Sequence, residues 1–243
     1  MKIMKYDNKK ILEENKKNII KKLFNDVSQK YDLMNDIMSF GLHRIWKRDL
    51  IKLAKRERAN IILDLAGGTG DISNSLAKTL NNSLVILYDL SYEMINYGKN
   101  KKKDNRENLL FVNGSADQLA IKNNSVDLIT IVFGLRNFAD KDKCIKECWR
   151  VLKYGKKIYV LEFSPSVNEI IYPLYNFYSN KIIPYLGEKV ANNRAAYAYL
   201  VESIEDFPHN QELENIFTKN GFFCYNRKKY LGGIAYLNVF SKI

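Results

Sequence analysis

Residues 61–71, Ile-Ile-Leu-Asp-Leu-Ala-Gly-Gly-Thr-Gly-Asp, decide how the rest of the sequence is interpreted. The apolar run Ile61–Leu65 predicts a short strand, and it leads directly into a cluster of glycines. Because glycine lets a backbone turn sharply and approach a ligand closely, Gly67, Gly68 and Gly70 predict a loop that touches a bound molecule. Open parallel sheets bind ligands beyond the carboxyl ends of their strands, which is where this loop is expected.

The chain around this loop alternates between apolar runs and amphipathic segments. We expect further strands at residues 84–88, 109–112, 126–133 and 157–163, and helices at 72–80, 92–103, 141–152 and 212–220. Such alternation with short links predicts strands joined by right-handed crossovers, and therefore a doubly wound, mostly parallel α/β sheet. The segments 222–230 and 234–241, joined through Gly232 and Gly233, predict a closing antiparallel strand pair.

Two helical regions are expected in addition to this sheet. Residues 1–60 predict an N-terminal helical extension, with helices at 9–30 and 45–57, that packs on the core. Residues 61–243 predict the ligand-binding domain, which a tyrosine-rich helical insertion interrupts at about 166–205.

The composition is that of an ordinary globular chain, with 46% apolar and 27% charged residues. No run of about 18 apolar residues predicts a membrane-spanning helix, and the N-terminus lacks the apolar centre of a secretion signal. Cys144, Cys148 and Cys224 have no histidine near them in the sequence, so we expect no metal site and interpret them as small, half-buried residues. A reducing, cytoplasmic compartment fits these free cysteines.

The net charge of +12 is concentrated in residues 1–60. The interpretation we favour is a lysine-rich composition with solvated faces. Attraction to an anionic membrane surface is the second interpretation. Nucleic-acid binding comes third, because no zinc-finger spacing or RNA-recognition signature supports it.

The residue after the glycines indicates the class of ligand. A dinucleotide loop presents a bare helix N-terminus to a pyrophosphate, whereas Asp71 follows the loop here. Its carboxylate would repel phosphates but suits a ligand with an ammonium and a sulfonium, such as S-adenosylmethionine. The loop is also not G-x-G-x-x-G, and no Walker lysine follows it. The sequence therefore predicts an S-adenosylmethionine-dependent methyltransferase with a Rossmann-like, class I methyltransferase-like fold.

Positions after the second and third strands complete the expected cofactor site. Asp89 lies about 20 residues beyond the glycines, where an acid accepts hydrogen bonds from both ribose hydroxyls. The alternative for Asp89 is a helix cap, a role that Ser91 can fill instead. Ser115 and Ala116 are expected beside the adenine. Asp117 is expected to accept from the adenine amine, unless it only forms a turn.

Five longer stretches form a recognisable set. They are YDLMNDIMSFGLHRIWK (31–47), LDLAGGTGD (63–71), FGLRNF (133–138), RVLK (150–153) leading to LEFS (161–164), and YLVESI (199–204). The set resembles the motifs of the UbiE family, the C-methyltransferases of ubiquinone and menaquinone biosynthesis, and its bacterial branch more than the mitochondrial one. The resemblance covers roughly residues 20–243. One departure, Tyr154-Gly-Lys156 in place of the usual Pro-Gly-Gly, is expected to alter only a turn.

The resemblance implies methyl transfer to a ring carbon of a prenylated quinol, which is a polyprenyl methoxybenzoquinol, a demethylmenaquinol or both. Carried over by position, it implies cofactor contacts at Thr69, Asp89, Ser115 with Ala116, and Val132. Two of these positions depart from the family pattern. Ser115 stands where asparagine is frequent, and Val132 replaces a small serine or alanine, so only a backbone contact is expected from Val132.

Ring methylation requires a carbon that an ionised neighbouring phenol makes nucleophilic, and phenols titrate at a pKa of about 10. A base, a relaying water or a nearby cation is therefore expected. Arg194 is the first candidate, with a solvated surface role as its alternative. Arg136 and Asn137 would contact the quinol oxygens, unless they only hold their loop together. His43 would be the base, although we favour a structural role that locks the N-terminal helices.

The polyprenyl tail requires an apolar channel. Aromatic residues of the insertion could roof it as a group, although core packing is the simpler role for each: Tyr172, Tyr175, Phe177, Tyr178 and Tyr185. The basic N-terminal helix would hold the enzyme near the bilayer. The expected partners are the prenylated quinol, a membrane surface, and a quinone-biosynthesis complex or a second copy, without nucleic acid. The expected location is the cytoplasm at the inner membrane, or alternatively the matrix face of the mitochondrial inner membrane.

Three other functions stay open. The first is a methyltransferase for another phenol or lipid, against which the stretches 31–47 and 136–143 argue. The second is a non-catalytic cofactor-binding scaffold, and the intact pair Thr69 and Asp89 indicates that cofactor binding is retained. The third is an RNA methyltransferase, for which the chain has neither an Asn-Pro-Pro-Tyr-type motif nor a catalytic cysteine after the fourth or fifth strand.

Overall fold

The computed structural model describes residues 14–25, 33, 35–36, 39, 41–101, 106–183, 185, 188–189 and 194–243, with the backbone alone at 101 and 194–196. The helix expected over 9–30 is helical throughout 14–25, and its outer parts lie outside the described residues. Within the described ranges, no helix is both long and apolar enough to span a bilayer.

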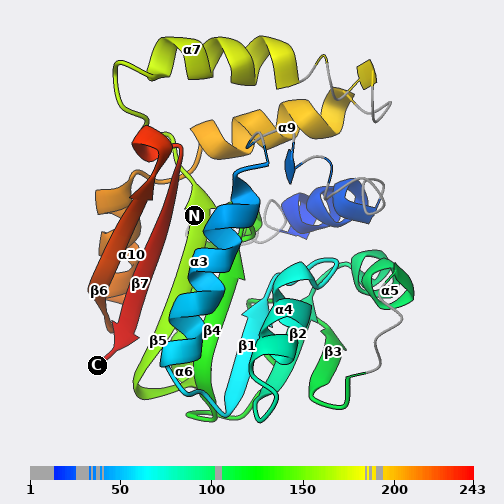
Figure 1. Cartoon of the computed structure of the whole chain (residues 1–243), viewed down its shortest axis with the longest axis vertical. Coiled ribbons are helices and arrows are strands. Elements are labelled where there is room, and N and C mark those ends of the chain that lie inside the picture. Colours follow the sequence, from blue (N-terminus) through cyan, green and yellow to red (C-terminus); the bar gives the residue numbers. More distant parts are fainter. Residues whose placement is uncertain are drawn as a thin grey trace, which may run out of the picture.

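A seven-stranded sheet forms the centre of the molecule, with the strand order β3-β2-β1-β4-β5-β7-β6 (Figure 1). The strands are β1 (Ile61–Leu65), β2 (Leu84–Asp89), β3 (Leu109–Asn113), β4 (Val126–Val132), β5 (Leu152–Phe163), β6 (Phe222–Tyr230) and β7 (Ala235–Lys242). Strands β1 to β5 pair in parallel, and β7 runs antiparallel between β5 and β6. The predicted doubly wound sheet with its closing antiparallel pair is therefore confirmed.

The strand order reverses between β1 and β4. From β1 the chain adds β2 and β3 on one side, and β4 and β5 then pair on the other side. Strand β4 is buried at every position, as its mostly apolar sequence predicts for a central strand covered on both faces. A crevice is therefore expected beyond the carboxyl ends of β1 and β4, where open sheets of this kind bind ligands.

Helices cover both faces of the sheet. They are α3 (His43–Arg56), α4 (Asp71–Thr79), α5 (Tyr92–Lys101), α6 (Lys141–Val151), α7 (Tyr172–Phe177), α9 (Arg194–Glu205) and α10 (Asn210–Lys219), with 3-10 turns at Leu135–Asn137 and Leu231–Gly233 and a π-helical turn at Tyr178–Ile182. Apolar side chains of α3, α4 and α9 belong to one core cluster, and those of α6 and α10 belong to a second. Trp46 of α3 stacks on Tyr230 with 5.6 Å between ring centroids, so the N-terminal segment contributes to the first cluster.

The insertion forms a helical layer beyond the carboxyl ends of the parallel strands. Figure 1 shows α7 along the top of the molecule, with α9 between α7 and the sheet. None of the α7 side chains is buried, whereas α9 buries Tyr197, Leu200 and Val201. Helix α9 is therefore the inner helix of the layer, and α7 is the outer one.

The start of β5 differs from the expectation. The strand begins at Leu152, which already pairs with Val126, rather than at residue 157. A shift in register follows, and Gly155 adopts a φ of +70° in this irregular part. The segment Tyr154-Gly-Lys156, expected to alter only a turn, is thus part of the strand, because pairing with β4 begins ahead of it.

Candidate active site

The glycine loop between β1 and α4 turns through left-handed backbone conformations. Gly68 and Gly70 have φ values of +56° and +76°, which residues with a Cβ rarely adopt. Gly70 directly precedes α4, so the loop ends at a helix N-terminus. A Cβ at Gly67 would lie 2.7 Å from Leu87 Cγ, which leaves no room for a side chain. The glycines therefore fix the shape of the loop.

Asp89 connects the end of β2 to this loop. Its Oδ2 accepts a hydrogen bond from Gly68 N at 2.8 Å, and its Oδ1 accepts from Ser91 N at 2.8 Å. Ser91 caps α5 by accepting from Met94 N at 3.1 Å, so that helix does not need Asp89 as its cap. Burial raises the pKa of Asp89, although the amides of Ser91 and Gly68 act in the opposite direction. Each carboxylate oxygen keeps a further lone pair for a ligand hydroxyl.

Two adjoining cavities surround the loop. The larger, which we call the donor cavity, lies among the ends of β1, β2 and β3, the residues after β4, and the helix at 14–25. The smaller, which we call the loop cavity, lies between the glycine loop, α3 and the end of β4. Ala66, Gly68 and Phe133 line both cavities, so the two form one continuous site.

The structure brings most of the predicted cofactor residues to these cavities. The donor cavity is lined by Gly68, Asp89, Ser115 and Ala116. The loop cavity is lined by Gly67, Thr69 and Val132. Gly70 belongs to neither lining, and its part is to end the loop in the left-handed conformation.

Asp117 is set back from the lining of the donor cavity. Its Oδ1 accepts from Ser115 Oγ at 2.6 Å, and its Oδ2 accepts from Lys17 of the helix at 14–25. Burial opposes ionisation of Asp117, but the hydrogen bonds from Lys17 and Ser115 outweigh it and lower the pKa to about 2. The carboxylate thus orients Ser115 and ties the N-terminal helix to the rim of the cavity.

Lys47 is a functional candidate that the sequence analysis did not single out. Only 10% of its side chain is exposed, and its Nζ donates to Asp71 Oδ2 at 3.0 Å beside the loop cavity. The pair places an ammonium and a carboxylate at one small cavity. A signal was present in the sequence, since Lys47 shares a helical face with His43, Leu50 and Ala54, all of them buried. A lysine on an apolar face needs an anionic partner or ligand.

Asp64 is a second carboxylate beneath the loop. Its Oδ1 accepts from Thr130 Oγ1 at 2.8 Å, and its Oδ2 accepts from Ser73 Oγ. Burial raises the pKa of Asp64 to about 6 in spite of these hydroxyl donors. The two hydrogen bonds connect β1 to β4 and to α4, so they fix the relative positions of the elements that line the loop cavity.

Arg136 lies in the turn after β4, and its side chain is fully buried in an ion pair with Glu162 of β5. Its Nη1 donates to one carboxylate oxygen, and its backbone N donates to the other at 3.3 Å. Its Nε and Nη2 have no hydrogen-bond partner among the described residues. The guanidinium lies 5.6 Å from the ring centroid of Phe163, which stacks on Phe133 of both cavities. Because unpaired buried N–H groups cost free energy, an oxygen of a ligand would satisfy them.

Asn137 lines the donor cavity next to Arg136 in the chain. Tyr199 of α9 donates from its hydroxyl to Asn137 Oδ1 at 3.3 Å.

Burial raises the pKa of Tyr175 to about 12, although the nearby charge of Arg136 acts against that rise. Tyr175 also lines a third cavity between α7 and α9, the insertion cavity, together with Tyr172, Val201 and Ile204. Arg136 itself lines neither cavity, but its chain neighbour Asn137 lines the donor cavity, and Tyr175, which is near its charge, lines the insertion cavity.

His43 is buried at the start of α3. Its Nδ1 lies 2.8 Å from Ser39 Oγ, and its ring meets Phe133 edge-on at 6.4 Å. Burial and the positive charge of Lys47 lower the pKa of His43 to about 4, so the imidazole is neutral at physiological pH. A neutral imidazole accepts protons, but one with so low a pKa is a weak base.

The remaining candidates are Arg194 and the aromatic residues of the insertion, which differ in how exposed they are. Arg194 begins α9, and its side chain lies outside the described residues. In the insertion, Tyr178 is buried and Tyr175 is half-buried, whereas Tyr172, Phe177 and Tyr185 are exposed. Only Tyr172 and Tyr175 of these aromatics line the insertion cavity.

Cys144 and Cys148 are buried, and Cys224 is half-buried, as expected of small packing residues. Burial raises the pKa of both the Cys144 and the Cys148 thiol, the latter to about 12, so both stay protonated. No group of three or more His, Cys, Asp or Glu side chains converges on one point within the described ranges. That the enzyme works without a metal stays a prediction.

Over residues 9–242, the sequence matches the family model of the ubiE/COQ5 methyltransferase family. Relatives named ubiquinone/menaquinone biosynthesis C-methyltransferase UbiE match almost the whole chain. The relative from Rickettsia prowazekii is 42% identical over 241 residues, which cover 97% of this chain and 97% of that protein. The relative from Haemophilus ducreyi is 40% identical over 233 residues, which cover 95% of this chain and 90% of that protein.

Solved structures share the fold at low sequence identity. A SAM-dependent methyltransferase from Thermotoga maritima superposes with a TM-score of 0.60 at 17% identity, over 92% of this chain and 100% of that chain. A SAM-dependent methyltransferase from Aquifex aeolicus gives a TM-score of 0.59 at 16% identity, over 79% and 89%. These likenesses confirm the class I methyltransferase fold, and at such identities they carry no information about the acceptor.

Proposed function

We propose, from the premise that this chain belongs to the ubiE/COQ5 methyltransferase family, that it uses S-adenosylmethionine to methylate a ring carbon of a prenylated quinol. The acceptor is a polyprenyl methoxybenzoquinol, a demethylmenaquinol or both, in ubiquinone or menaquinone biosynthesis. The names of the relatives support this acceptor. The observation that carries the proposal is the buried Arg136 guanidinium, whose Nε and Nη2 lack a partner among the described residues and whose chain neighbour Asn137 lines the donor cavity.

The donor cavity would hold the nucleoside part of the donor. Asp89 would accept hydrogen bonds from the ribose hydroxyls, since each of its oxygens has a lone pair beyond its bond to the loop or to Ser91. Ser115 and Ala116 would border the adenine. Asp117 would affect adenine binding indirectly, because it orients the hydroxyl of Ser115.

The loop cavity fits the amino-acid end of the donor, which carries a carboxylate and an ammonium. Lys47 and Asp71 present the complementary charges with 3.0 Å between Nζ and Oδ2. Because an ammonium has three donor hydrogens, Lys47 can keep its bond to Asp71 while it binds the ligand carboxylate. Thr69 and the backbone of Val132 complete this cavity.

Replacing Lys47 with methionine is expected to raise the dissociation constant of S-adenosylmethionine about ten- to a hundredfold, because a hydrogen bond to a charged group contributes about 1.5–3 kcal/mol. Decarboxylated S-adenosylmethionine lacks the carboxylate, so the wild type should bind it weakly and K47M should bind both donors equally. Calorimetry with the two ligands measures this discrimination. Lys55→Met, on the exposed face of the same helix, is the matched control. If K47M still preferred the carboxylated donor, another residue would hold the carboxylate.

S-adenosylmethionine, when bound, supplies the methyl group as a substituent of its sulfonium. The electron pair of the methyl–sulfur bond would leave with the neutral thioether as the ring carbon takes the methyl. The hydrogen of that carbon would then pass as a proton to solvent water as the ring regains its aromaticity. The protein must hold the acceptor as a phenolate. Arg136 would donate from Nε and Nη2 to the quinol oxygen and lower its pKa from about 10. Glu162 keeps the guanidinium in place, and Asn137 would bind the adjacent part of the acceptor.

His43 and Arg194 are the other proposed participants in proton transfer. Because the pKa of His43 is lowered to about 4, we assign it a structural role through Ser39 rather than the role of the main base. Arg194 would orient a water molecule from the start of α9, a proposal that rests on its position in the chain.

The prenyl tail of the acceptor indicates where the enzyme works. We place it in the cytoplasm at the surface of the inner membrane, with the matrix face of the mitochondrial inner membrane as the alternative. The net charge of +12 supports attraction to anionic lipid. Assembly with other quinone-synthesis enzymes or with a second copy would keep the lipid-soluble intermediate close by.

A transfer assay with two acceptors tests the proposed function. The purified chain is incubated with methyl-labelled S-adenosylmethionine and either the polyprenyl methoxybenzoquinol or the demethylmenaquinol, and products are analysed by mass spectrometry. We expect a carbon-methylated quinone from at least one acceptor. A label on oxygen, or transfer only to a simple catechol, would contradict the quinol assignment. Donor binding without any turnover would indicate the scaffold instead.

A further inference from the structure

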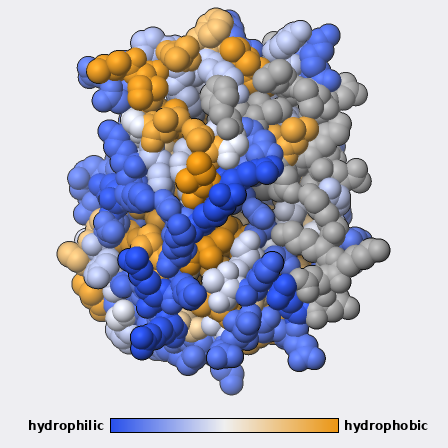
Figure 2. Space-filling view, in the orientation of Figure 1, coloured by the Kyte–Doolittle hydropathy of each residue, from blue (hydrophilic) through white to orange (hydrophobic). Residues whose placement is uncertain are grey.

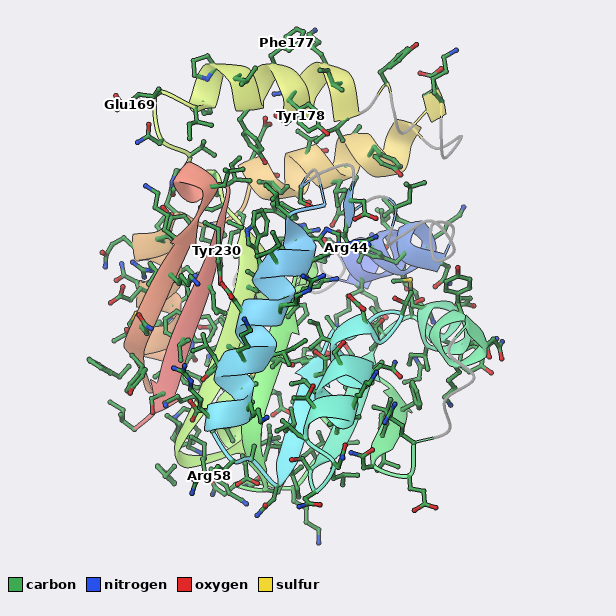
Figure 3. The ribbon with its side chains drawn as sticks, viewed as in Figure 1. Arg44, Arg58, Glu169, Phe177, Tyr178 and Tyr230 are labelled. Atoms are coloured by element: carbon green, nitrogen blue, oxygen red, sulfur yellow. The ribbon has the colours of Figure 1, made fainter. Side chains whose placement is uncertain are left out.

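The outer face of the insertion gathers exposed apolar side chains. Ile170 and Leu174 are 89% and 73% exposed, the highest values among the large apolar residues that the structure describes. Tyr172 and Phe177 are each at least half exposed. Leu174 and Phe177 share one face of α7 by their spacing, Ile170 lies one turn ahead of Leu174, and we call these three residues the α7 face. Figure 2 shows apolar surface across the top of the molecule, where α7 runs, and Figure 3 shows Phe177 on the outer side of the helix, away from the protein body.

This grouping distinguishes α7 from the other exposed apolar residues. Leu110, for example, is exposed singly on the edge strand β3, and Phe223 is accompanied on the edge strand β6 by Tyr225 alone among the exposed large apolar residues of that strand. Scattered apolar residues are normal on soluble proteins, whereas a contiguous set marks an interaction surface. The α7 face also combines two aliphatic side chains with a phenylalanine, a composition that favours insertion at the boundary between water and lipid.

The α7 face has the insertion cavity beneath it. Tyr172 lies on the opposite side of α7 from Leu174, is half exposed and lines the cavity. Tyr175, one helical turn further on, lines the same cavity and lies close enough to Arg136 to sense its charge. The inner wall is apolar where α9 contributes Val201 and Ile204. Residues of one short helix therefore connect the exposed face to the neighbourhood of Arg136.

We propose that the α7 face docks on a lipid bilayer, and that the isoprenoid tail of the acceptor passes from the bilayer into the insertion cavity beneath it. The docking surface rests on Ile170, Leu174 and Phe177. The passage of the tail rests, in addition, on the proposed quinol function.

A bilayer suits this face better than a second copy of the chain. A stable protein interface buries about 800 Å² on each partner, and three side chains, two of them on the six-residue helix α7, offer less than that. Two copies that each carry a net charge of +12 repel each other, whereas an anionic membrane attracts them. The insertion itself carries four acidic and three basic residues, so local insertion depends on the apolar side chains.

Vesicle flotation with the full chain tests the docking surface. We expect the wild type to float with vesicles that contain phosphatidylglycerol and less with pure phosphatidylcholine. The double variant L174D/F177D should reduce the partition coefficient at least about tenfold, because it removes two buried apolar side chains from the lipid. The double variant L110D/F223D changes the same residue types on the edge strands and should float like the wild type.

The outcomes separate docking from catalysis. The vesicles contain no quinol, so flotation reports docking even if the chain methylated nothing. With a short-tailed soluble acceptor, L174D/F177D should keep wild-type turnover, and with a long-tailed acceptor in vesicles it should lose activity. Equal flotation of both double variants would overturn the proposal, because the membrane contact would then lie elsewhere. A lipid-free dimer in ultracentrifugation that only L174D/F177D dissociates would also overturn it in favour of a second copy.

Discussion

Asp89→Ala is expected to raise the dissociation constant of S-adenosylmethionine by at least about a hundredfold. Two hydrogen bonds from the ribose to a carboxylate contribute about 1.5–3 kcal/mol each, so their joint loss corresponds to about 10²- to 10⁴-fold. The loss also extends to the loop, because Asp89 Oδ2 accepts from Gly68 N. Titration calorimetry with S-adenosylmethionine and with its demethylated product measures the change.

Two variants separate ribose binding from the shape of the loop. Asp89→Asn keeps the size of the side chain and one acceptor oxygen, so it should weaken binding less than Asp89→Ala. Glu93→Gln removes an exposed acid in the first turn of α5 and should leave binding unchanged. If Asp89→Ala melted like the wild type and bound the donor within about threefold of it, the ribose would have to be held by other groups.

The sheet could be predicted because its signals are local. Strand β4 is continuous and mostly apolar, and it proved to be buried at every position. The glycines after β1 required a turn at the carboxyl end of a strand, and Gly68 and Gly70 adopt the left-handed conformations that such a turn needs. The early start of β5 could not be predicted, since it depends on pairing between Leu152 and Val126, which are distant in sequence.

The sequence predicts only those residues of the candidate site that directly follow a parallel strand, because such residues lie at one edge of the sheet. Asp89 and Ser115 follow two parallel strands, so topology alone places them at the same edge. Lys47 was missed because its importance depends on a contact with Asp71 in another helix. The partner of Arg136 was missed for the same reason, since Glu162 lies on the neighbouring strand and its side chain is buried.

The N-terminal extension contributes more to the site than its charge suggested. Lys17 pairs with Asp117, and Asn25 accepts from Ser91 Oγ at 2.6 Å, so both ends of the helix at 14–25 are tied to the donor cavity. Ile20 and Phe24 line that cavity between the two ties. Lys17 and Lys21, two of the basic residues near the N-terminus, therefore line the donor cavity.

Arg136→Met combined with Glu162→Gln is expected to lower kcat about 10²- to 10³-fold, the usual cost of removing a preorganised donor to a developing oxyanion. Donor binding should change little, because neither side chain lines the donor cavity. Single-turnover transfer to the quinol, with calorimetry for the donor, measures the two effects separately.

The paired change is needed because the ion pair is buried. Arg136→Met alone would leave Glu162 as an unpaired buried carboxylate, which destabilises a protein by about 3–5 kcal/mol, so lost activity would not distinguish catalysis from unfolding. In the double variant both charges disappear and the melting temperature should stay near that of the wild type.

The pH profile gives the decisive contrast. If Arg136 stabilises the phenolate, activity of the double variant should recover as pH rises toward the phenol pKa of about 10. A uniformly low, pH-independent rate would show that Arg136 only holds the turn after β4 in place.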